Sequence, residues 1–356
     1  MAVTSPALRQ VGRLRRVGVV AGLAVLALAA SHGALWWWIG GRIERQVAAT
    51  IAAPGLPGWR ATAEVRRGGG WPLAVRVEVA GLVVTAPLAG IDTVVWRAEH
   101  LSVAIELAHP RTLMLAVSGR QEIQMGAEPP TPVRAARMRA QVPLEPGVPT
   151  RAVTIEVVGL EAGLPGGRFA LGQLDITAET RPAAQQGEPA ATLGVVARAV
   201  ELPPVREWPL GPRIERLDFD LVVTGPVPRA QDLAERAEAW RDGGGALELR
   251  RLELVWGEVT VAGGATLALD GQLQPMGAAT ARVGGHSAAL RALTASGALT
   301  PRSALTAGVV LGLMARPPSA GGAPVVEVPL TLQNRTLSLG RIPLRRLPNL
   351  VWRPPP

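Results

Sequence analysis

The sequence feature that most constrains this chain is an uninterrupted apolar stretch near its N-terminus. Residues 17–39 form 23 positions, and the only ionisable side chain among them is that of His32. About 20 apolar residues are enough to cross the hydrocarbon core of a bilayer as a helix. The arginines that precede the stretch are Arg9, Arg13, Arg15 and Arg16. By the positive-inside rule they predict a cytoplasmic tail over residues 1–16, with everything from about residue 40 onward across the membrane.

Three tryptophans close the apolar stretch, and indole rings favour the headgroup level of a membrane. Trp36, Trp37 and Trp38 are therefore expected to anchor a transmembrane helix at its far interface, with Arg13, Arg15 and Arg16 at the near one. The alternative is a cleaved signal peptide, because Ala27-Leu28-Ala29 matches an A-x-A cleavage site. The apolar run continues ten residues past that site, which favours the retained anchor. Both interpretations export the rest of the chain.

The formal charge of +9 belongs to the two ends of the chain. Residues 1–16 hold four arginines and no acid, residues 335–356 hold five arginines and no acid, and the body between them is neutral. A neutral body argues against a nucleic-acid partner. Near the C-terminus, Arg341, Arg345 and Arg346 are candidates for contact with anionic lipid headgroups, at up to ~1 kcal/mol per cation. A solvated tail kept soluble by its charge is the alternative.

Beyond the apolar stretch the periodicity changes twice. Ile43, Val47 and Ile51 recur every four residues, which predicts an amphipathic connector helix over 40–54. A β-rich periplasmic body follows over 55–350, with a short tail at 351–356. Its strand-like segments, recognised by period-two alternation between Pro- and Gly-containing turns, lie at 73–80, 91–107, 112–126, 132–142, 151–159, 169–180, 191–201, 213–224, 246–256 and 258–269.

A few helices interrupt the strands. A charged helix over 229–242 ends at three glycines, and a division of the body into two sub-domains falls near 229–245. Helices are also predicted over 286–296 and 301–315; the second is too short to span a membrane and is expected to be buried. In the last strands, the apolar parity shifts at Arg250-Arg251, which predicts a β-bulge, and a hairpin turns at Asn334-Arg335.

The fold class that follows is mainly β (α+β), with an N-terminal transmembrane helix, curled antiparallel β-sheets and a few packing helices. Three short motifs carry a resemblance: Gly70-Trp71-Pro72, Trp96-Arg97-Ala98-Glu99, and the closing hairpin over 328–344. In this order behind one membrane span, they resemble a domain-of-unknown-function family of bacterial inner-membrane-anchored periplasmic proteins that is distantly AsmA-like. The resemblance implies a single-pass inner-membrane protein with a cytoplasmic N-terminus. AsmA-like proteins are linked to envelope biogenesis and to lipid movement along curled sheets with an apolar inner face.

Residues that could carry catalysis are few. The chain has no cysteine and no lysine, which excludes thiol chemistry, cysteine-based metal sites and lysine phosphate loops. Gly285-His286-Ser287 resembles a nucleophile elbow, but no histidine follows Ser287 to act as its base. His100 and His109 lack the spacing of a metal site. Asp218 and Asp220 share one strand face, where a solvent-facing edge explains them without catalysis.

The sequence therefore predicts a non-enzymatic membrane-anchored envelope protein with no cofactor, whose sheet binds or shields an apolar ligand such as a lipid acyl chain. The alternatives are an interaction scaffold for other envelope proteins and a hydrolase with an unrecognised site. An ordinary β-sandwich core would show the same alternation of apolar and polar residues. The decisive observation is whether the apolar face of the sheet is open or filled.

Overall fold

A computed structural model describes most of the chain. The described residues are 6–55, 58–88, 91–144, 152–164, 166–204, 207–228, 232–297, 299–314, 325–340 and 342–352. They form two compact units, which are taken separately below. The first unit holds Met1–Gly119 and Gln124–Glu128, and the second holds Arg120–Ile123 and Pro129–Pro356. The region near 229–245 lies inside the second unit.

The first unit consists of one long helix and a four-stranded antiparallel sheet. Its strands follow chain order, and each pairs with the next. The elements are α1 (Pro6–Ala52), β1 (Arg60–Arg67), β2 (Ala74–Leu88), β3 (Ile91–Glu106) and β4 (Thr112–Met125), of which Arg120–Ile123 count with the second unit.

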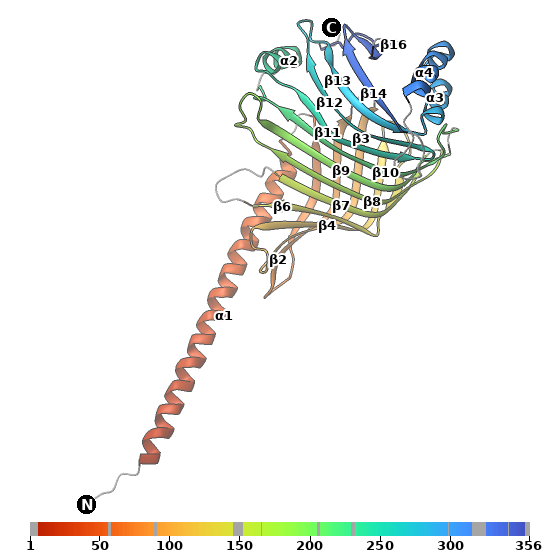
Figure 1. Ribbon diagram of the computed structural model, residues 1–356. Helices are drawn as coiled ribbons and strands as arrows, with labels where there is room; N and C mark the ends of the chain where they lie inside the picture. The colour runs from red at the N-terminus through yellow and green to blue at the C-terminus, as the bar shows by residue number, and fades with distance from the viewer. Residues whose placement is uncertain are drawn as a thin grey trace, which may run out of the picture. The chain divides into compact units, whose positions relative to one another are not determined.

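The predicted transmembrane and connector helices form a single uninterrupted helix, α1 (Figure 1). The predicted stripe of Ile43, Val47 and Ile51 is confirmed, because all three pack against a core cluster that includes the fully buried Val77 and Val79 of β2. Within the described residues, α1 also holds a stretch that is long and apolar enough to cross a membrane, with a mean hydropathy of 1.4. A signal sequence has the same properties, so this observation fits both interpretations.

The second unit continues the antiparallel pattern. Its strands pair in the order β5-β7-β8-β9-β10-β11-β12-β13-β14-β15-β16, with β6 also on β7. The strands are β5 (Thr131–Arg134), β6 (Arg137–Pro143), β7 (Ala152–Leu164), β8 (Gly167–Thr180), β9 (Pro189–Glu201), β10 (Arg213–Thr224), β11 (Leu247–Trp256), β12 (Val259–Leu269), β13 (Pro275–Gly284), β14 (Val325–Gln333), β15 (Thr336–Leu339) and β16 (Ile342–Arg346). The helices are α2 (Leu233–Asp242), α3 (His286–Ala295) and α4 (Pro301–Met314).

Most predicted elements are confirmed, with three differences. The segment 132–142 forms two strands, β5 and β6, and the closing segment after the hairpin turn divides into β15 and β16 at Gly340. The strand β13, which precedes the 286–296 helix, pairs with β12 and β14 in the same antiparallel sheet. The helix predicted over 301–315 is present as α4, but it is buried on one face only: Ala307 and Leu311 are buried, whereas Leu305 and Val309 are exposed.

Two local predictions are confirmed in detail. Arg250 and Arg251 lie at a register shift on both sides of β11, so the β-bulge is present. The last hairpin turns at Asn334 and Arg335, which both have a positive φ, of 47° and 63°. Two positive φ angles between paired strands are the signature of a type I′ turn, which asparagine tolerates without glycine. Gln333 and Thr336 close it as a direct pair.

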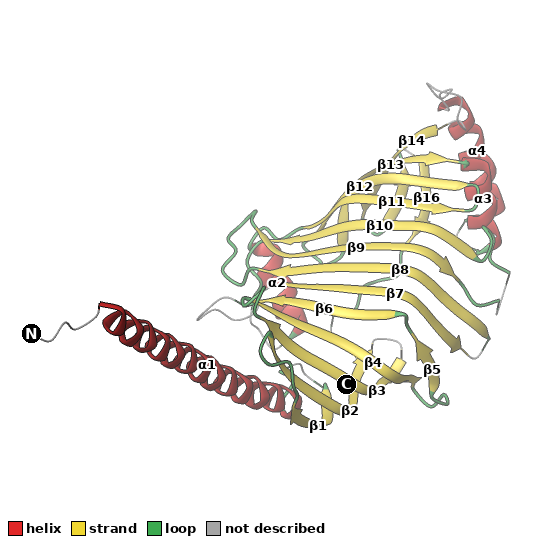
Figure 2. Cartoon of the chain, turned by 90° about the horizontal axis from the view of Figure 1, so that it is seen from below, coloured by secondary structure: helices red, strands yellow, loops and turns green. Residues whose placement is uncertain are grey.

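Strands β7 to β14 of the second unit lie side by side (Figure 2). Their pairing places apolar residues along one face. Directly paired residues share a face of a sheet. One row across this face is Val157, Leu174, Ala197, Leu217, Leu254, Val261, Val283 and Val326, and the row beside it is Ile155, Ile176, Val195, Phe219, Leu252, Gly263, Ala281 and Val328. The row between them on the opposite face is mostly charged, from Glu156 and Asp175 to Arg282 and Glu327.

Candidate functional site

The apolar face of the second unit is covered by helices at its C-terminal end. There α4 places Ala307 and Leu311 in a buried cluster with Val326 and Val328 of β14, and Leu339 of β15 completes the cluster. Further along the two rows, most side chains of β8 to β12 are only half-buried. Residues in a closed sandwich core are fully buried, so this part of the face is not filled by the second unit itself.

A pocket of about 450 Å³ lies where α3 and α4 cross this apolar face. Its floor is formed by residues of the two rows, namely Val261, Ala281, Val283 and Val328. Its walls come from both helices and from β15 and β16. Binding pockets for small molecules typically measure about 300–1,000 Å³ and are lined mainly by apolar side chains. The size and lining of this pocket therefore suit an apolar ligand.

Two ionisable residues stand in the lining of the pocket, His286 and Arg345. His286 is the first residue of α3, and Gly285 before it adopts a φ of 65°. A Cβ at Gly285 would lie 2.1 Å from the backbone oxygen of Glu258, so only glycine fits this tight approach. Arg345 comes from β16 and is exposed at the surface of the unit. A cation at the edge of an apolar pocket suits a ligand with an apolar chain and an anionic head.

The predicted headgroup residues separate in the structure. Arg345 lines the pocket, together with Leu344 and Leu347, whereas its neighbour Arg346 does not. Arg341 lies outside the described residues. Arg345 and Arg346 are neighbours in the sequence, but of these two only Arg345 lines the pocket. Closeness in the sequence alone therefore did not distinguish the arginine at the pocket from the one beside it.

The residues considered for catalysis are not assembled into a site. Ser287 is exposed in the first turn of α3. His100 and His109 each contact an acid close in sequence, Glu99 at 3.4 Å and Glu106 at 3.8 Å, and all four side chains are at least half exposed. Among the described residues, no group of three or more His, Asp and Glu side chains lies close enough together to hold a metal ion.

The expectation that Asp218 faces solvent is wrong. Asp218 does lie on the polar face of β10, opposite Leu217 and Phe219, but it is only 1% exposed. Arg216, two residues along the same face, donates to its carboxylate and also pairs with Glu253 at 3.0 Å. The hydrogen bond and charge of Asp218 raise the pKa of the Arg216 guanidinium, so this cation stays charged. Arg216 thereby satisfies Oδ2 of the buried carboxylate, whereas Oδ1 has no hydrogen-bond partner among the described residues.

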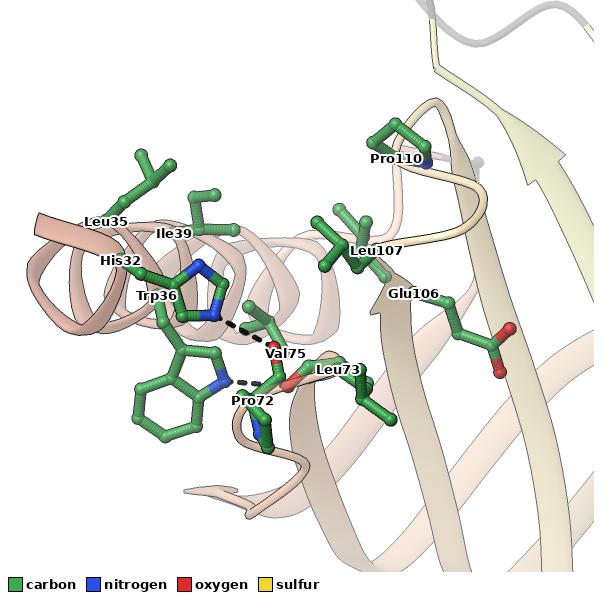
Figure 3. Close-up of a pocket in the computed structure, with 12 residues that line it drawn as sticks. His32, Leu35, Trp36, Ile39, Pro72, Leu73, Val75, Glu106, Leu107 and Pro110 are labelled. Atoms are coloured by element: carbon green, nitrogen blue, oxygen red, sulfur yellow. Dashed lines mark hydrogen bonds between the residues drawn. The ribbon is translucent and has the colours of Figure 1, made fainter. Parts of the chain in front are cut away.

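The first unit has a distinct apolar end, built from α1 and two strand connections (Figure 3). The His32 ring lies 2.9 Å from the backbone oxygen of Pro72, and Trp36 donates from Nε1 to the backbone oxygen of Ala74 at 2.6 Å. Gly70 shapes this connection, because its φ is 106° and its oxygen accepts hydrogen bonds from the amides of Leu73 and Ala74. The Gly-Trp-Pro motif is therefore the contact point between α1 and β2.

The predicted anchor tryptophans have different surroundings. Trp36 is partly buried by its hydrogen bond to the β1–β2 connection, whereas Trp37 and Trp38 are exposed. The Arg67 guanidinium lies 5.2 Å from the centre of a Trp37 ring and pairs with Glu44 at 3.0 Å. Arg67 thereby fixes α1 against β1 on the side where Gly40 and Gly41 leave room for it. The side chains of Arg13, Arg15 and Arg16 lie outside the described residues.

Sequence reasoning missed both pockets at the level of residues. The α3–α4 pocket depends on helices that fold back over β12 to β16, which no local pattern reports. A second pocket, of about 100 Å³, lies between α1 and the two strand connections of the first unit and includes Leu73 and Leu107. The signal for it was available in part, since Leu73 follows the Gly-Trp-Pro motif and Leu107 precedes His109-Pro110.

The fold and the pockets together define a protein with an N-terminal apolar helix and a predominantly antiparallel β body. A family model described as uncharacterized proteins conserved in bacteria, DUF2125, matches residues 36–348. The chain belongs to this family, which confirms the predicted membership of a bacterial family without known function. No curated protein and no solved structure matches the chain.

Proposed function

We propose that this is a non-enzymatic, membrane-anchored protein of the bacterial envelope that binds a lipid acyl chain in the α3–α4 pocket. The observation that carries the proposal is the pair of apolar rows, which run half-buried across β8 to β12 and end in the pocket of about 450 Å³. Each methylene moved from water into such a site contributes about 0.8 kcal/mol. A flexible chain can follow the rows, and the distant AsmA-like resemblance supports the same ligand class.

Arg345 sets the polar end of the proposed ligand. It stands at the edge of the pocket, whereas Glu327 of β14 lies on the opposite face of the sheet. A carboxylate or phosphate on the ligand accepts hydrogen bonds from the guanidinium while the chain occupies the apolar lining. The proposed ligand class is thus an anionic single-chain or diacyl lipid.

A pocket-filling substitution tests the binding proposal. Ala289 on α3 lines the pocket, and Ala289→Phe is expected to occupy the space that the ligand needs. The full-length protein, reconstituted in vesicles, should lose binding of a photoreactive fatty acid, measured by cross-linking and mass spectrometry. Ala295→Phe is the matched control, because Ala295 is exposed on the same helix.

A charge substitution distinguishes the contribution of the ligand's anionic head to binding from the contribution of its apolar chain. Arg345→Gln should weaken cross-linking of the fatty acid more than that of the corresponding fatty alcohol, and Arg346→Gln should affect neither. Equal cross-linking in the wild-type protein and the Ala289→Phe variant, together with no lipid extracted from the purified protein, would contradict the proposal.

We place α1 across the inner membrane once, with the N-terminus in the cytoplasm and the body in the periplasm. Support comes from the arginines before the apolar stretch and from the exposure of Leu23, Val25, Leu26 and Leu28 on α1. The intact mass of the membrane-extracted protein distinguishes a retained helix from a signal peptide cleaved after Ala29. Protease added to spheroplasts should digest the body and spare a tag at the N-terminus.

A scaffold for other envelope proteins is the second proposal, favoured by one feature. Leu305 and Val309 are 74% and 67% exposed on the outer face of α4, and a Cβ at the exposed Gly312 would meet nothing within 4 Å. Cross-linking in cells from position 305 tests it: a stoichiometric protein partner with no bound lipid would favour the scaffold over the lipid-binding function.

A further inference from the structure

The apolar end of the first unit is unusually exposed for a protein surface. Trp71, Leu73 and Leu107 are 58%, 70% and 60% exposed, and they come from the β1–β2 and β3–β4 connections. These three residues are called the apolar tip below. Leu73 and Leu107 line the small pocket against α1, beside Leu35, and the ring of Trp71 lies 6.5 Å from that of His32, which also lines the pocket. Contiguous exposed apolar side chains on a soluble surface mark a site of contact with another molecule or with a membrane.

The depth of α1 in a membrane decides what the apolar tip contacts. An α-helix rises 1.5 Å per residue, and the hydrocarbon core is about 30 Å thick, so crossing it takes about 20 residues. The apolar stretch starts at residue 17, directly after Arg15 and Arg16. Residues 17–31 alone would reach only about 22 Å. The helix must therefore still be crossing the far leaflet at His32 and Leu35.

The apolar tip is attached to that same part of the helix. His32 contacts the backbone oxygen of Pro72, between Trp71 and Leu73, and the rings of His32 and Trp71 lie 6.5 Å apart. Residues in contact with His32 lie at the depth of His32 in the membrane. The sheet end that carries the apolar tip consequently cannot stand clear of the lipid.

We propose that the apolar tip is a second membrane contact, which inserts Trp71, Leu73 and Leu107 into the periplasmic leaflet beside α1. This inference rests on the proposed membrane span of α1 and goes beyond it, because a tethered body needs no lipid contact of its own. Tryptophan and leucine are the side chains favoured at this depth. His109 and Arg111 follow Leu107 in the chain. Both side chains are polar and exposed, and they suit the level of the lipid phosphates.

The chain has no cysteine, so single cysteines can be introduced for labelling without altering native ones. We would place a polarity-sensitive dye at Leu73→Cys and at Leu107→Cys in the full-length protein, reconstituted in phosphatidylethanolamine–phosphatidylglycerol vesicles. Leu28→Cys, on the exposed surface of α1, reports whether the helix crosses the bilayer. Glu128→Cys is the matched control, because Glu128 is exposed beyond the opposite end of β4.

Quenching by lipids that carry a quencher at a known depth is the readout. The dyes at positions 28, 73 and 107 should lose emission, with the dye at 28 quenched from the greatest depth and the dye at 128 unaffected. If 28 is quenched while 73 and 107 behave like 128, the membrane contact of the apolar tip is wrong and the span stands. If 28 also behaves like 128, the span itself is wrong and the inference fails with it.

Because Leu73 and Leu107 are largely exposed, these substitutions should leave the fold intact, which thermal unfolding of each labelled variant checks. A further variant, which combines Leu73→Glu with the dye-labelled Leu107→Cys, is expected to reduce quenching of the dye at position 107, because a carboxylate at position 73 is costly to insert into lipid. An unchanged quenching profile in that variant, with an intact fold, would also overturn the proposal.

Discussion

At the scale of single residues, several tryptophans of this chain stabilise loops and strand ends through hydrogen bonds from their indole nitrogens. Trp36, Trp208, Trp240, Trp256 and Trp352 each donate from the indole nitrogen to a backbone oxygen of another segment, at 2.6–2.9 Å. Trp59 and Trp71, in contrast, are exposed. An amphipathic ring with one donor is well suited to the margin of a core, where an apolar body and a polar partner are both at hand.

Gln274 has a comparable role at the C-terminal segment. Its side chain is 5% exposed and exchanges two hydrogen bonds with the backbone of Leu350, at 2.9 and 3.1 Å. Gln274→Met should release the segment around Leu350 at a cost of about 1–2 kcal/mol, since each hydrogen bond contributes about 1 kcal/mol. Faster hydrogen exchange at Leu350, with little change after Gln272→Met at an exposed position, is the expected measurement.

At the scale of elements, the strands were predictable and the continuity of α1 was not. Period-two alternation located nearly every strand, and the parity shift located the bulge at Arg250-Arg251, because both signals are local. The change of pattern predicted a transmembrane helix over 17–39 and a separate connector helix over 40–54, and the boundary falls at Gly40-Gly41, where glycine is a poor helix former. In the structure both glycines are buried against β1 and β2, so tertiary packing overrides the propensity.

The packing of α1 against the sheet can be tested at these glycines. A Cβ at Gly40 would lie 3.4 Å from Cγ1 of Val75, so Gly40→Leu must displace α1 or β2 and should cost about 1–3 kcal/mol. The matched control is Gly33→Leu, because a Cβ there meets nothing within 4 Å. Trypsin should cleave after Arg45 faster in the first variant only. Equal cleavage in both variants would show that the glycines are not needed for docking.

At the scale of the whole molecule, the sequence predicted an apolar face but not whether anything covers it. Leu217 and Phe219 alternate with Asp218 in an open sheet and in a closed sandwich alike. Coverage depends on where α3 and α4 fold, which is a matter of contacts distant along the chain. The burial of Asp218 was missed for a related reason, because Glu253, which pairs with Arg216 beside Asp218, comes from the neighbouring strand β11.

Two substitutions that introduce a carboxylate compare the half-buried part of the apolar face with the part that α4 covers. The quantity compared is the loss of folding stability. Ile176 is half-buried on β8, several strands away from α3 and α4, so Ile176→Glu should cost only about 1–2 kcal/mol, since the carboxylate reaches water. Val326 is 0% exposed beneath α4, and Val326→Glu should cost more than about 4 kcal/mol. Chemical denaturation in detergent checks both values. Equal losses would mean that the middle of the face is covered as well.

The continuity of α1 has a kinetic consequence. With 47 residues at 1.5 Å each, the helix is about 70 Å long, and the part that enters the body is packed against it and does not act as a hinge. A body on a flexible linker tumbles freely and meets its ligands from every direction. In the membrane span proposed above, a rigid helix would hold the first unit at one height above the bilayer while the protein diffuses and rotates in the membrane plane. Its search for ligands would then take place in two dimensions and not in three.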